Sequence, residues 1–540
     1  VIKNHINELN KQRLKEVKIK LKQHKLPAKL MQIVEAYRNQ VQFVTHPWDD
    51  WFAFIDENYK IPTYEDSYKE NPNLMVSYLM DDLVITREFY NKALNVIKET
   101  GKNTEIYKQE NELIRIVAEM ERRGLRVDIN YLLESRERVM KHKAMKYNEL
   151  KEMTGIEFSV GQHRVIKDLF KDKFDIELEK TDIKALEKLT KYKNEDIKKI
   201  ASTILELRTI DKWLSTYIEG KLNKVIDGRI HTSINNSGTI TGRVSSDLQQ
   251  EPKEPLLDKD GNELFHPRRL VINDDGFKTY YFDYSQMELR VQAQYTVDVA
   301  GGDKNLCRAF IPFECQSLFT GETYPLGSKE WDSEEWIDEN GNPWTPTDLH
   351  SVTTLEAFPE LGSTKHPEFS QYRKLGKMCN FLKNYGGGID AIKSQIINND
   401  EIASKLNKGY YNAFPKILDY QKWVEDNLTQ YGFVENIYGR RYYLQSNNYY
   451  YKAYNYIIQG SCADMMKEKE LQVYDLLKPY KSDMLLPIHD EIQISIADGE
   501  EYLVPQIKKI MESTSNVIKT IPMTCDVEVT NTSWAEKENL

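Results

Sequence analysis

Two aspartates, Asp283 and Asp490, stand beside strongly apolar runs that are typical of strands. Asp283 follows the run in GFKTYYFDYS (276–285), and Asp490 interrupts MLLPIHDEIQISI (484–496). Carboxylates flanked by core-type residues are costly unless they are paired or bind a metal ion. Two of them at one place would form an all-oxygen site suited to Mg²⁺, and two such ions about 3.5–4 Å apart serve in-line phosphoryl displacement. Taken alone, each acid also has the plain interpretation of a turn or capping residue.

A third segment, RKLGKMCNFLKNYGGG, adds a stripe of cations and rings. Arg373, Lys377, Phe381 and Tyr385 recur every four residues, which keeps them on one face of a helix. The cations suit a polyphosphate, and the rings suit a sugar and a base. Glycines 386–388 end the helix beside Tyr385. A cationic pair at this spacing is usually only a solvated face, but the full stripe closed by glycines indicates a binding site.

The elements that must position these residues follow from the apolar periodicity. The expected order is helix over 1–45, an aromatic loop over 46–73, nearly continuous helix over 74–230, a strand over 276–285, a surface excursion over 311–349, helices over 366–430 and a hairpin over 484–496. Gly124 follows a Glu- and Arg-rich turn and is the expected C-cap of one helix. His489 and Asp490 fall at the turn of the hairpin.

The composition is that of an ordinary soluble chain of several domains. It has 540 residues, 40% hydrophobic and 29% charged, with no apolar run near the ~18–20 residues of a membrane span and no signal-peptide core. Its five cysteines form no CxxC pair, which predicts a reduced, cytoplasmic location and no zinc module.

The net charge of the whole chain is −10, yet residues 101–230 carry 28 basic and 24 acidic side chains, a local charge of +4. That distribution is compatible with a phosphate-binding surface or with ordinary solvated helices.

The three segments together resemble motifs A, B and C of the family A DNA polymerases, the bacterial DNA polymerase I group. These are DYSQMELR (283–290), Arg373-xxx-Lys377-xxx-Phe381-xxx-Tyr385-Gly386 and His489-Asp490-Glu491. Four further pieces are similar to segments of that family: MERRGLRVD (120–128), HTSINNSGTITGRVSSDLQQEP (231–252), Asp348-Leu349-His350 and Asn455-xxx-Gln459-Gly460. The resemblance spans about residues 110–540.

Upstream, Tyr78-xxx-Asp82 is similar to the third motif of the 3′–5′ proofreading domain. That domain needs a D-x-E pair for its metals, and none of the aspartates between residues 1 and 77 belongs to one. The resemblance therefore implies an N-terminally truncated chain that keeps an exonuclease remnant without its main ligands. We expect no 3′–5′ exonuclease activity.

The implied fold is α+β, a multidomain right hand with an antiparallel palm sheet and helical fingers and thumb, plus the exonuclease remnant. The implied boundaries are 1–105 for the C-terminal part of an exonuclease-like domain, 106–230 for the thumb, 231–300 for the first part of the palm, 301–350 for the fingers entry with an acidic insertion, 351–432 for the fingers and 433–540 for the second part of the palm.

The resemblance also implies a role for each matching residue. Asp283 and Asp490 would hold two Mg²⁺ ions, which Mn²⁺ can replace, with the Tyr284 carbonyl as a further ligand. The implied catalytic residues are Asp283, Asp490, Glu491 and Lys377. The implied dNTP-binding residues are Arg373, Lys377, Phe381, Tyr385, His350, Glu288 and Gln286. The implied DNA contacts are Arg243, Asn455, Gln459 and His489, from the minor-groove side. Glu288 would sit under the 2′ carbon of the sugar.

Three departures from the family pattern stand out. Glu251 replaces an apolar residue, and Tyr451 replaces an arginine. An acidic stretch over 311–346, with tryptophans at 331, 336 and 344, has no bacterial counterpart. These features are most similar to a bacteriophage replicative polymerase in the host cytoplasm. Such an enzyme extends a primer 3′-OH with dNTPs on a DNA template and releases pyrophosphate; its partners are primer–template DNA and dNTPs, with accessory proteins as further candidates and no membrane.

Two other functions compete with this one. A single-subunit RNA polymerase shares the palm and a lysine/tyrosine fingers helix, but it lacks the Q-x-E-L-R continuation after Asp283, and Glu288 would obstruct a ribose 2′-OH. A degenerate accessory clamp would lack a metal-binding acid, whereas Asp283 and Asp490 are both present.

Overall fold

The computed structural model describes residue 69 and residues 72–99, 103–310, 348–444, 446, 449–513 and 518–540, with four short strands between 315 and 344. The chain divides into two compact units, Val1–Asn95 and Val96–Leu540. Helix α5 (Pro72–Glu99) agrees with the helix expected from residue 74. The helix predicted over 1–45 and nearly all of the loop predicted over 46–73 fall outside the described residues.

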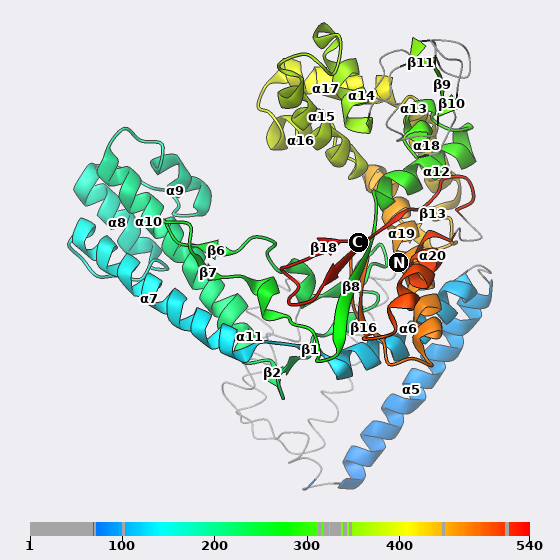
Figure 1. Ribbon diagram of the computed structural model, residues 1–540, viewed down its shortest axis with the longest axis horizontal. Coiled ribbons are helices and arrows are strands. Elements are labelled where there is room, and N and C mark those ends of the chain that lie inside the picture. The colour runs from blue at the N-terminus through cyan, green and yellow to red at the C-terminus, as the bar shows by residue number, and fades with distance from the viewer. Residues whose placement is uncertain are drawn as a thin grey trace, which may run out of the picture. The chain divides into compact units, whose positions relative to one another are not determined.

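The centre of the second unit is a five-stranded sheet in the order β15-β16-β8-β17-β18, antiparallel throughout. Its strands are β8 (Phe277–Tyr284), β15 (Asp483–Ile488), β16 (Glu491–Ala497), β17 (Cys525–Thr530) and β18 (Glu538–Asn539). Both the strand and the hairpin expected from the sequence are therefore confirmed. Buried sheet residues share one hydrophobic core, here called the sheet core, with helices α6 (Asn103–Arg123), α12 (Met287–Ala300), α19 (Tyr450–Leu477) and α20 (Val504–Glu512) (Figure 1).

A second core, here called the helical core, lies among α14 (Leu349–Ala357), α15 (Phe369–Asn384), α16 (Ile389–Gln395) and α17 (Asp400–Ala413). Helix α18 (Lys416–Tyr431) contributes to both cores, since Ile417 belongs to the helical core and Tyr420 to the sheet core. Helix α12 does the same, with Leu289 in the helical core and Val291 in the sheet core. The two cores are thus joined by shared helices.

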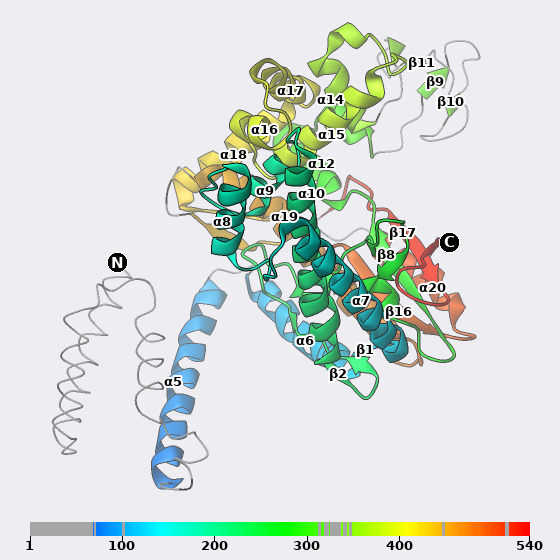
Figure 2. The same cartoon turned by 90° about the vertical axis from the view of Figure 1, so that its left-hand side faces the viewer.

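A third group of helices carries its own core: α7 (Ile129–Thr154), α8 (His163–Phe174), α9 (Ile183–Leu189) and α10 (Glu195–Lys212). Helices α7 and α10 pack along each other (Figure 2). Helix α6, which precedes them, packs instead against α19 and β15. Gly124 ends α6 with φ +63°, and its N–H donates to the Met120 carbonyl at 2.9 Å, as expected for a C-cap.

Short elements complete the described chain. The strands are β1 (Leu125–Arg126), β2 (Val225–Ile226), β3 (Arg229–Ile230), β4 (Ile234–Asn235), β5 (Ser245–Ser246), β6 (Leu256–Leu257), β7 (Glu263–Phe265), β9 (Cys315–Ser317), β10 (Thr323–Tyr324), β11 (Trp336–Ile337), β12 (Pro343–Trp344), β13 (Phe433–Glu435) and β14 (Arg441–Tyr443). The helical turns are η1 (Trp213–Glu219), α11 (Gly220–Leu222), η2 (Asp247–Gln250), η3 (Pro267–Leu270), α13 (Lys304–Arg308), η5 (Pro359–Leu361) and η7 (Glu501–Leu503). Strands β9 to β12 form a small sheet inside the acidic stretch, and the rest of residues 311–347 lies outside the described residues. The predicted surface excursion there stays a prediction.

Candidate functional site

The β15–β16 hairpin and strand β8 bring Asp283 and Asp490 to the same end of the sheet. Glu491 of β16 pairs directly with Asp283 of β8, and the Tyr284 N–H donates to the Asp490 carbonyl at 3.2 Å. His489 takes the first position of the two-residue turn with φ +57°, a conformation that glycine usually supplies. Gln286, between β8 and α12, also has a positive φ of +54°. Such backbone conformations in non-glycine residues cluster at functional sites.

The two aspartates repel each other electrostatically. The pKa of Asp283 is raised from 3.8 to about 7, first by burial and then by the negative charges of Asp490 and Glu491. Burial likewise raises the pKa of Asp490. A divalent cation between the carboxylates would remove this penalty, because it favours their charged forms. Two hard carboxylate donors therefore fit Mg²⁺. Within the described residues, neither this site nor any other gathers three or more histidine, cysteine or acidic side chains in an arrangement that could hold a metal ion.

Glu491 is already neutralised by a lysine. Its Oε2 accepts from Lys537 Nζ at 2.5 Å, and its Oε1 accepts from Gln493 Nε2 at 2.9 Å. Lys537 also lies 3.2 Å from Glu528 and 3.8 Å from the centre of the Tyr281 ring. Glu491 is therefore held in place beside Asp283 rather than free to bind a metal ion alone. Sequence reasoning missed Lys537, because nothing in the local pattern links two residues 46 positions apart.

The predicted stripe lies on one helix. Arg373, Lys377 and Phe381 belong to α15, and Tyr385 is its C-cap. The Lys377 ammonium lies 5.9 Å from the centre of the Phe381 ring. The rings of Phe381 and Tyr385 are 45% and 51% exposed, which leaves both open to a ligand. The His350 ring lies 5.7 Å from that of Phe381.

Arg373 is held by the aspartate of the predicted Asp348-Leu349-His350 segment. Its Nη2 and Nε donate to the two carboxylate oxygens of Asp348 at 3.0 and 3.1 Å. Burial raises the pKa of Asp348, but hydrogen bonds from Arg373 and Ser351 outweigh it and leave that pKa below its ordinary value. The fork geometry fixes the direction of the guanidinium group.

His350 is oriented by a buried asparagine that sequence reasoning missed. Asn380 accepts from Thr353 Oγ1 at 2.8 Å, so its amide nitrogen faces His350 Nδ1 at 3.1 Å. Nδ1 must then be the acceptor, and the proton resides on Nε2. Burial lowers the pKa of His350, which favours this neutral form.

One groove of about 500 Å³ collects residues from all three motifs. Its lining includes Asp283, Tyr284, Gln286, Glu288, Phe381, Tyr385, His489, Asp490 and Arg243. It also includes residues the sequence did not single out: Val244, Met287, Leu289, Asn384, Cys462, Ala463, Met466, Glu470 and Pro487. The remaining predicted residues of this unit, Arg373, Lys377, His350, Glu491, Asn455 and Gln459, are not part of the lining. The volume lies within the usual range for small-molecule sites.

Two of the four predicted DNA contacts, Arg243 and Gln459, converge on Glu288. Arg243 Nη2 forms an ion pair with Glu288 Oε1, and Gln459 Nε2 donates to the same oxygen at 3.3 Å. Asn455 lies four residues before Gln459 on α19, and its buried Oδ1 has no partner among the described residues. An unsatisfied buried acceptor is costly, so a donor from a ligand would be favourable there.

The structure shows the surroundings of the two single-residue departures from the family pattern, Glu251 and Tyr451. Glu251 is buried and pairs with Lys221, which is also buried, at 2.5 Å. The acid is therefore compensated where the family has an apolar residue. The Tyr451 carbonyl lies against Gly386, where an added Cβ would come within 2.7 Å of it. Only glycine fits this contact, since Gly386 also has φ +74°.

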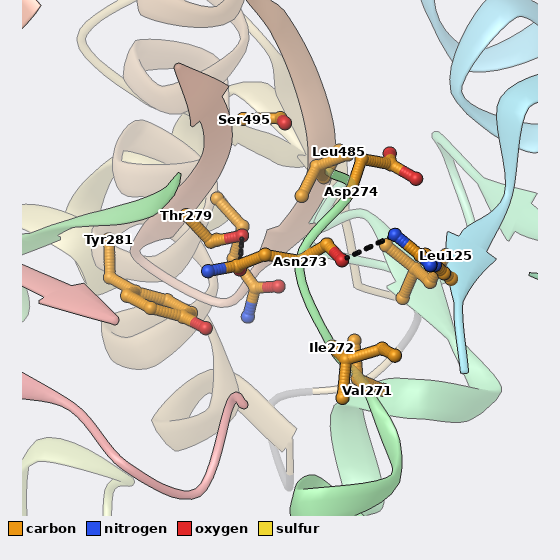
Figure 3. A pocket seen from close by; sticks show the side chains of 11 residues that line it. Leu125, Val271, Ile272, Asn273, Asp274, Thr279, Tyr281, Leu485 and Ser495 are labelled. Atoms are coloured by element: carbon orange, nitrogen blue, oxygen red, sulfur yellow. Dashed lines mark hydrogen bonds between the residues drawn. The ribbon is translucent and has the colours of Figure 1, made fainter. Parts of the chain in front are cut away.

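A second cavity lies between β1 and the sheet (Figure 3). Asn273 accepts from Thr279 Oγ1 at 2.7 Å and, through its carbonyl, from Arg126 Nη1 at 3.3 Å. Asp274 on its wall pairs with Arg229. Because Asn273 and Asp274 are already bonded to neighbouring residues, this cavity offers no chemistry comparable to that of the groove.

Tyr78 and Asp82 lie four residues apart on α5, with exposed side chains. Residues 1–77, in which the sequence contains no D-x-E pair, lie almost wholly outside the described residues. The exonuclease remnant therefore stays a prediction. In the described part of the chain, no helix is both long and apolar enough to cross a membrane.

Comparison with known proteins finds relatives over most of the chain. The chain is 27% identical over 512 residues to DNA polymerase I of Borreliella burgdorferi, covering 89% of this chain and 51% of that protein. It is also 27% identical to DNA polymerase I of Caldicellulosiruptor bescii, covering 87% and 53%. The chain thus spans about half the length of these relatives.

Its fold is similar to the POL domain of Pol1 from M. smegmatis, solved in complex with DNA primer-template and dNTP. The TM-score is 0.62 at 23% identity, over 81% of this chain and 72% of that one. The expected α+β polymerase fold is confirmed at this level. A family model described as DNA polymerase family A matches residues 129–536, which include every motif that forms the groove. The chain therefore belongs to DNA polymerase family A.

Proposed function

We propose that this chain is a template-directed DNA polymerase that extends a primer 3′-OH with dNTPs and releases pyrophosphate. The observation that carries the proposal is the groove, in which Asp283 and Asp490 face the aromatic end of the α15 stripe. Membership of family A supports the same activity. The M. smegmatis relative was solved with primer-template and dNTP, which makes these the proposed partners of this chain.

Asp283 and Asp490, with the Tyr284 carbonyl, would hold two Mg²⁺ ions. Bound there, the ions would activate the primer 3′-oxygen and stabilise the leaving oxygen. Glu491 lies opposite Asp283 in the sheet and forms an ion pair with Lys537. The protein residues thus supply a site that is poorly stable when empty and well matched to dipositive ions.

The triphosphate would lie along α15. Arg373 and Lys377 would bind its oxygens, and Lys377 would neutralise the charge that grows on pyrophosphate as it leaves. His350 presents Nε2–H, because Asn380 faces Nδ1, and so can donate to a phosphate oxygen. Phosphate binding by Arg373 would compete with Asp348.

The sugar and base would pack between α15 and α12. Phe381 would contact the sugar, Tyr385 would lie by the templating position, Gln286 would contact the bound dNTP, and Glu288 would face the 2′ carbon. Arg243, Asn455, Gln459 and His489 would meet the minor groove, whose acceptors are shared by all base pairs and so report pair geometry without sequence. The helices α7–α10 would contact backbone phosphates, which gives salt-sensitive binding.

The finer assignments are proposals of the same kind. We assign 231–300 and 433–540 to the palm, 301–350 to the fingers entry, 351–432 to the fingers, 106–230 to the thumb and 1–105 to an exonuclease remnant. The acidic stretch 311–346 supports a phage replicative enzyme acting on a phage genome.

The missing D-x-E pair supports the proposal that the chain has no 3′–5′ exonuclease activity. Metal-dependent 3′ degradation that copurifies with the chain and survives Asp82→Ala would contradict this proposal.

The test is primer extension with Mg²⁺. Asp283→Asn and Asp490→Asn should abolish extension, while affinity for primer–template stays within a few-fold because phosphate contacts dominate binding. Asp426→Asn, an exposed acid on α18, is the matched control and should extend primers normally. Extension by either active-site variant above about a hundredth of the parent rate would refute the two-metal assignment.

A further inference from the structure

Four charged side chains from α6, α19 and the residue before β14 form a cluster, here called the Arg440 cluster: Glu110, Arg440, Asp464 and Lys467. Arg440 Nη2 donates to Asp464 Oδ1 and Glu110 Oε1, each at 2.6 Å, and Lys467 Nζ donates to Glu110 Oε1 at 2.5 Å. The Asp464 side chain is fully buried, and that of Lys467 is 1% exposed. Two positive and two negative charges balance, so the cluster is stable only while all four stay in place.

The cluster contacts the loop 236–243 at both of its ends. At the first end, Asn236 Nδ2 and Ser237 Oγ donate to Glu110 Oε2 at 3.1 and 3.2 Å. At the second end, Gly242 packs on the Arg440 guanidinium so closely that an added Cβ would lie 2.9 Å from its Cζ. Gly242 also has φ +85°, which other residues rarely adopt.

A tyrosine next to the cluster also contacts the second end of the loop. Tyr442 Oη donates to the Thr241 carbonyl at 3.3 Å. The backbone of Gly460 on α19 leaves room for that hydroxyl, since an added Cβ would overlap it. Gly460 follows Gln459, whose amide donates to Glu288. The same turn of α19 therefore contacts both the loop and Glu288.

The loop ends at Arg243, the residue that faces the groove. The Arg243 N–H donates to Thr239 Oγ1 at 3.0 Å, which fixes the backbone at the last position of the loop. Its side chain then forms the ion pair with Glu288. A continuous set of contacts thus runs from Arg440 through Gly242 to Arg243 and Glu288.

We propose that Arg440 is a positioning residue for Arg243, and through Arg243 for the carboxylate of Glu288. The inference rests on the proposed function, because it assigns Arg440 a part in setting sugar selection and primer-end binding during DNA synthesis. Its planar guanidinium provides both the fork to Asp464 and the flat surface under Gly242. Lysine retains the charge but provides neither.

The test combines substitutions in the loop with a double-mutant cycle. Gly242→Ala inserts a methyl group against Arg440, whereas Gly261→Ala is the matched control, with φ +84° and open space around it. We measure kcat/KM for a dNTP and for the matching ribonucleotide in the parent chain and in Arg243→Ala. Melting temperatures of all variants show whether each is folded.

Gly242→Ala should lower kcat/KM for the dNTP by about tenfold and raise relative ribonucleotide use, whereas in Arg243→Ala the same change should cost about twofold or less. Gly261→Ala should leave both values unchanged. Arg440→Lys should reproduce the defect of Gly242→Ala, and Tyr442→Phe should show a milder form if the loop variant fails to fold.

Two results separate the possible failures. If Gly242→Ala costs the same factor with and without Arg243, or if Arg440→Lys retains normal sugar selection, the cluster has only a structural role and the inference is wrong. If the parent chain itself does not extend primers, the proposed function fails and the inference falls with it.

Discussion

Replacing Asp283 by asparagine should abolish primer extension and also raise the thermal stability of the chain in EDTA. The pKa of Asp283 is raised from 3.8 to about 7, mainly by burial and then by Asp490 and Glu491. The native state therefore binds the proton more tightly than the unfolded chain does. Stability is lost as the pH rises from about 4 to about 7, because the native state must then carry an unfavourable charge.

The size of the effect follows from the same shift. The pKa of Asp283 lies about three units higher in the native state than in the unfolded chain, which corresponds to about 4 kcal/mol at pH 8. The Asp283 side chain opens to solvent in the groove, and screening reduces the figure to about 1–2 kcal/mol. In a chain of this size that is a rise in Tm of about 1–3 °C. At pH 5 the unfolded carboxyl is ionised but the native one is protonated, so less than about half of the difference remains.

The assay is thermal unfolding of the parent chain, Asp283→Asn and the exposed-acid control Asp426→Asn at pH 5 and pH 8, in EDTA and in Mg²⁺. In EDTA at pH 8, Asp283→Asn should melt above the parent, and the control should match the parent. Mg²⁺ should raise the Tm of the parent more than that of Asp283→Asn, since ligand binding stabilises the state that binds it. If Asp283→Asn melts no higher than the parent at pH 8 in EDTA, the proposed repulsion does not exist. Equal Mg²⁺ shifts in both chains would refute the carboxylate site.

Four further outcomes are expected. Glu288→Ala should raise ribonucleotide use by one or more tenfold steps of about 1.4 kcal/mol each in a competition assay; unchanged selectivity would mean that Glu288 does not face the sugar. Phe381→Tyr should largely remove discrimination against dideoxynucleotides, because a phenol can replace the missing 3′-hydroxyl, and equal use of both sugars by the parent would make Phe381 a packing residue only. Asn380→Asp should reverse the hydrogen bond to His350 and raise KM for the dNTP by about tenfold, whereas an unchanged KM would separate that histidine from the triphosphate. Deleting 311–346 should leave distributive extension on short primers nearly intact, and a loss beyond about tenfold would place this acidic stretch at the DNA or the fingers.

Local patterns predicted the parts of the groove that are local in the chain. Asp283 and Asp490 could be identified from the sequence because an acid beside a run of strand-forming residues is easy to recognise. The α15 stripe could be identified because its members repeat every four residues on one helix. In both cases the signal and the structure share one short segment.

The supporting contacts could not be predicted in this way. Lys467 and Glu110 are 357 positions apart, and Asn380 and His350 are 30 apart, so no periodicity links them. Helical spacing likewise predicts α6 but does not say that it packs in the sheet core. Tertiary packing decides such contacts, and a single sequence carries no record of it.

Helix α12, which carries most of the DYSQMELR segment after Asp283, packs into both hydrophobic cores. Met287, Val291 and Tyr295 of α12 belong to the sheet core, whereas Leu289 and Ala293 belong to the helical core. One short helix therefore holds both cores together, and its first turn directly follows the strand that ends near Asp283.

Glu288 lies in that first turn, between residues of the two cores. Its carboxylate is fixed on one side by the helix and on the other by Arg243 and Gln459. A movement of either core against the other would therefore alter the distance between Glu288 and the α15 stripe. If Glu288 faces the sugar as proposed, sugar selection should accordingly depend on the packing of α12 as well as on the Glu288 side chain itself.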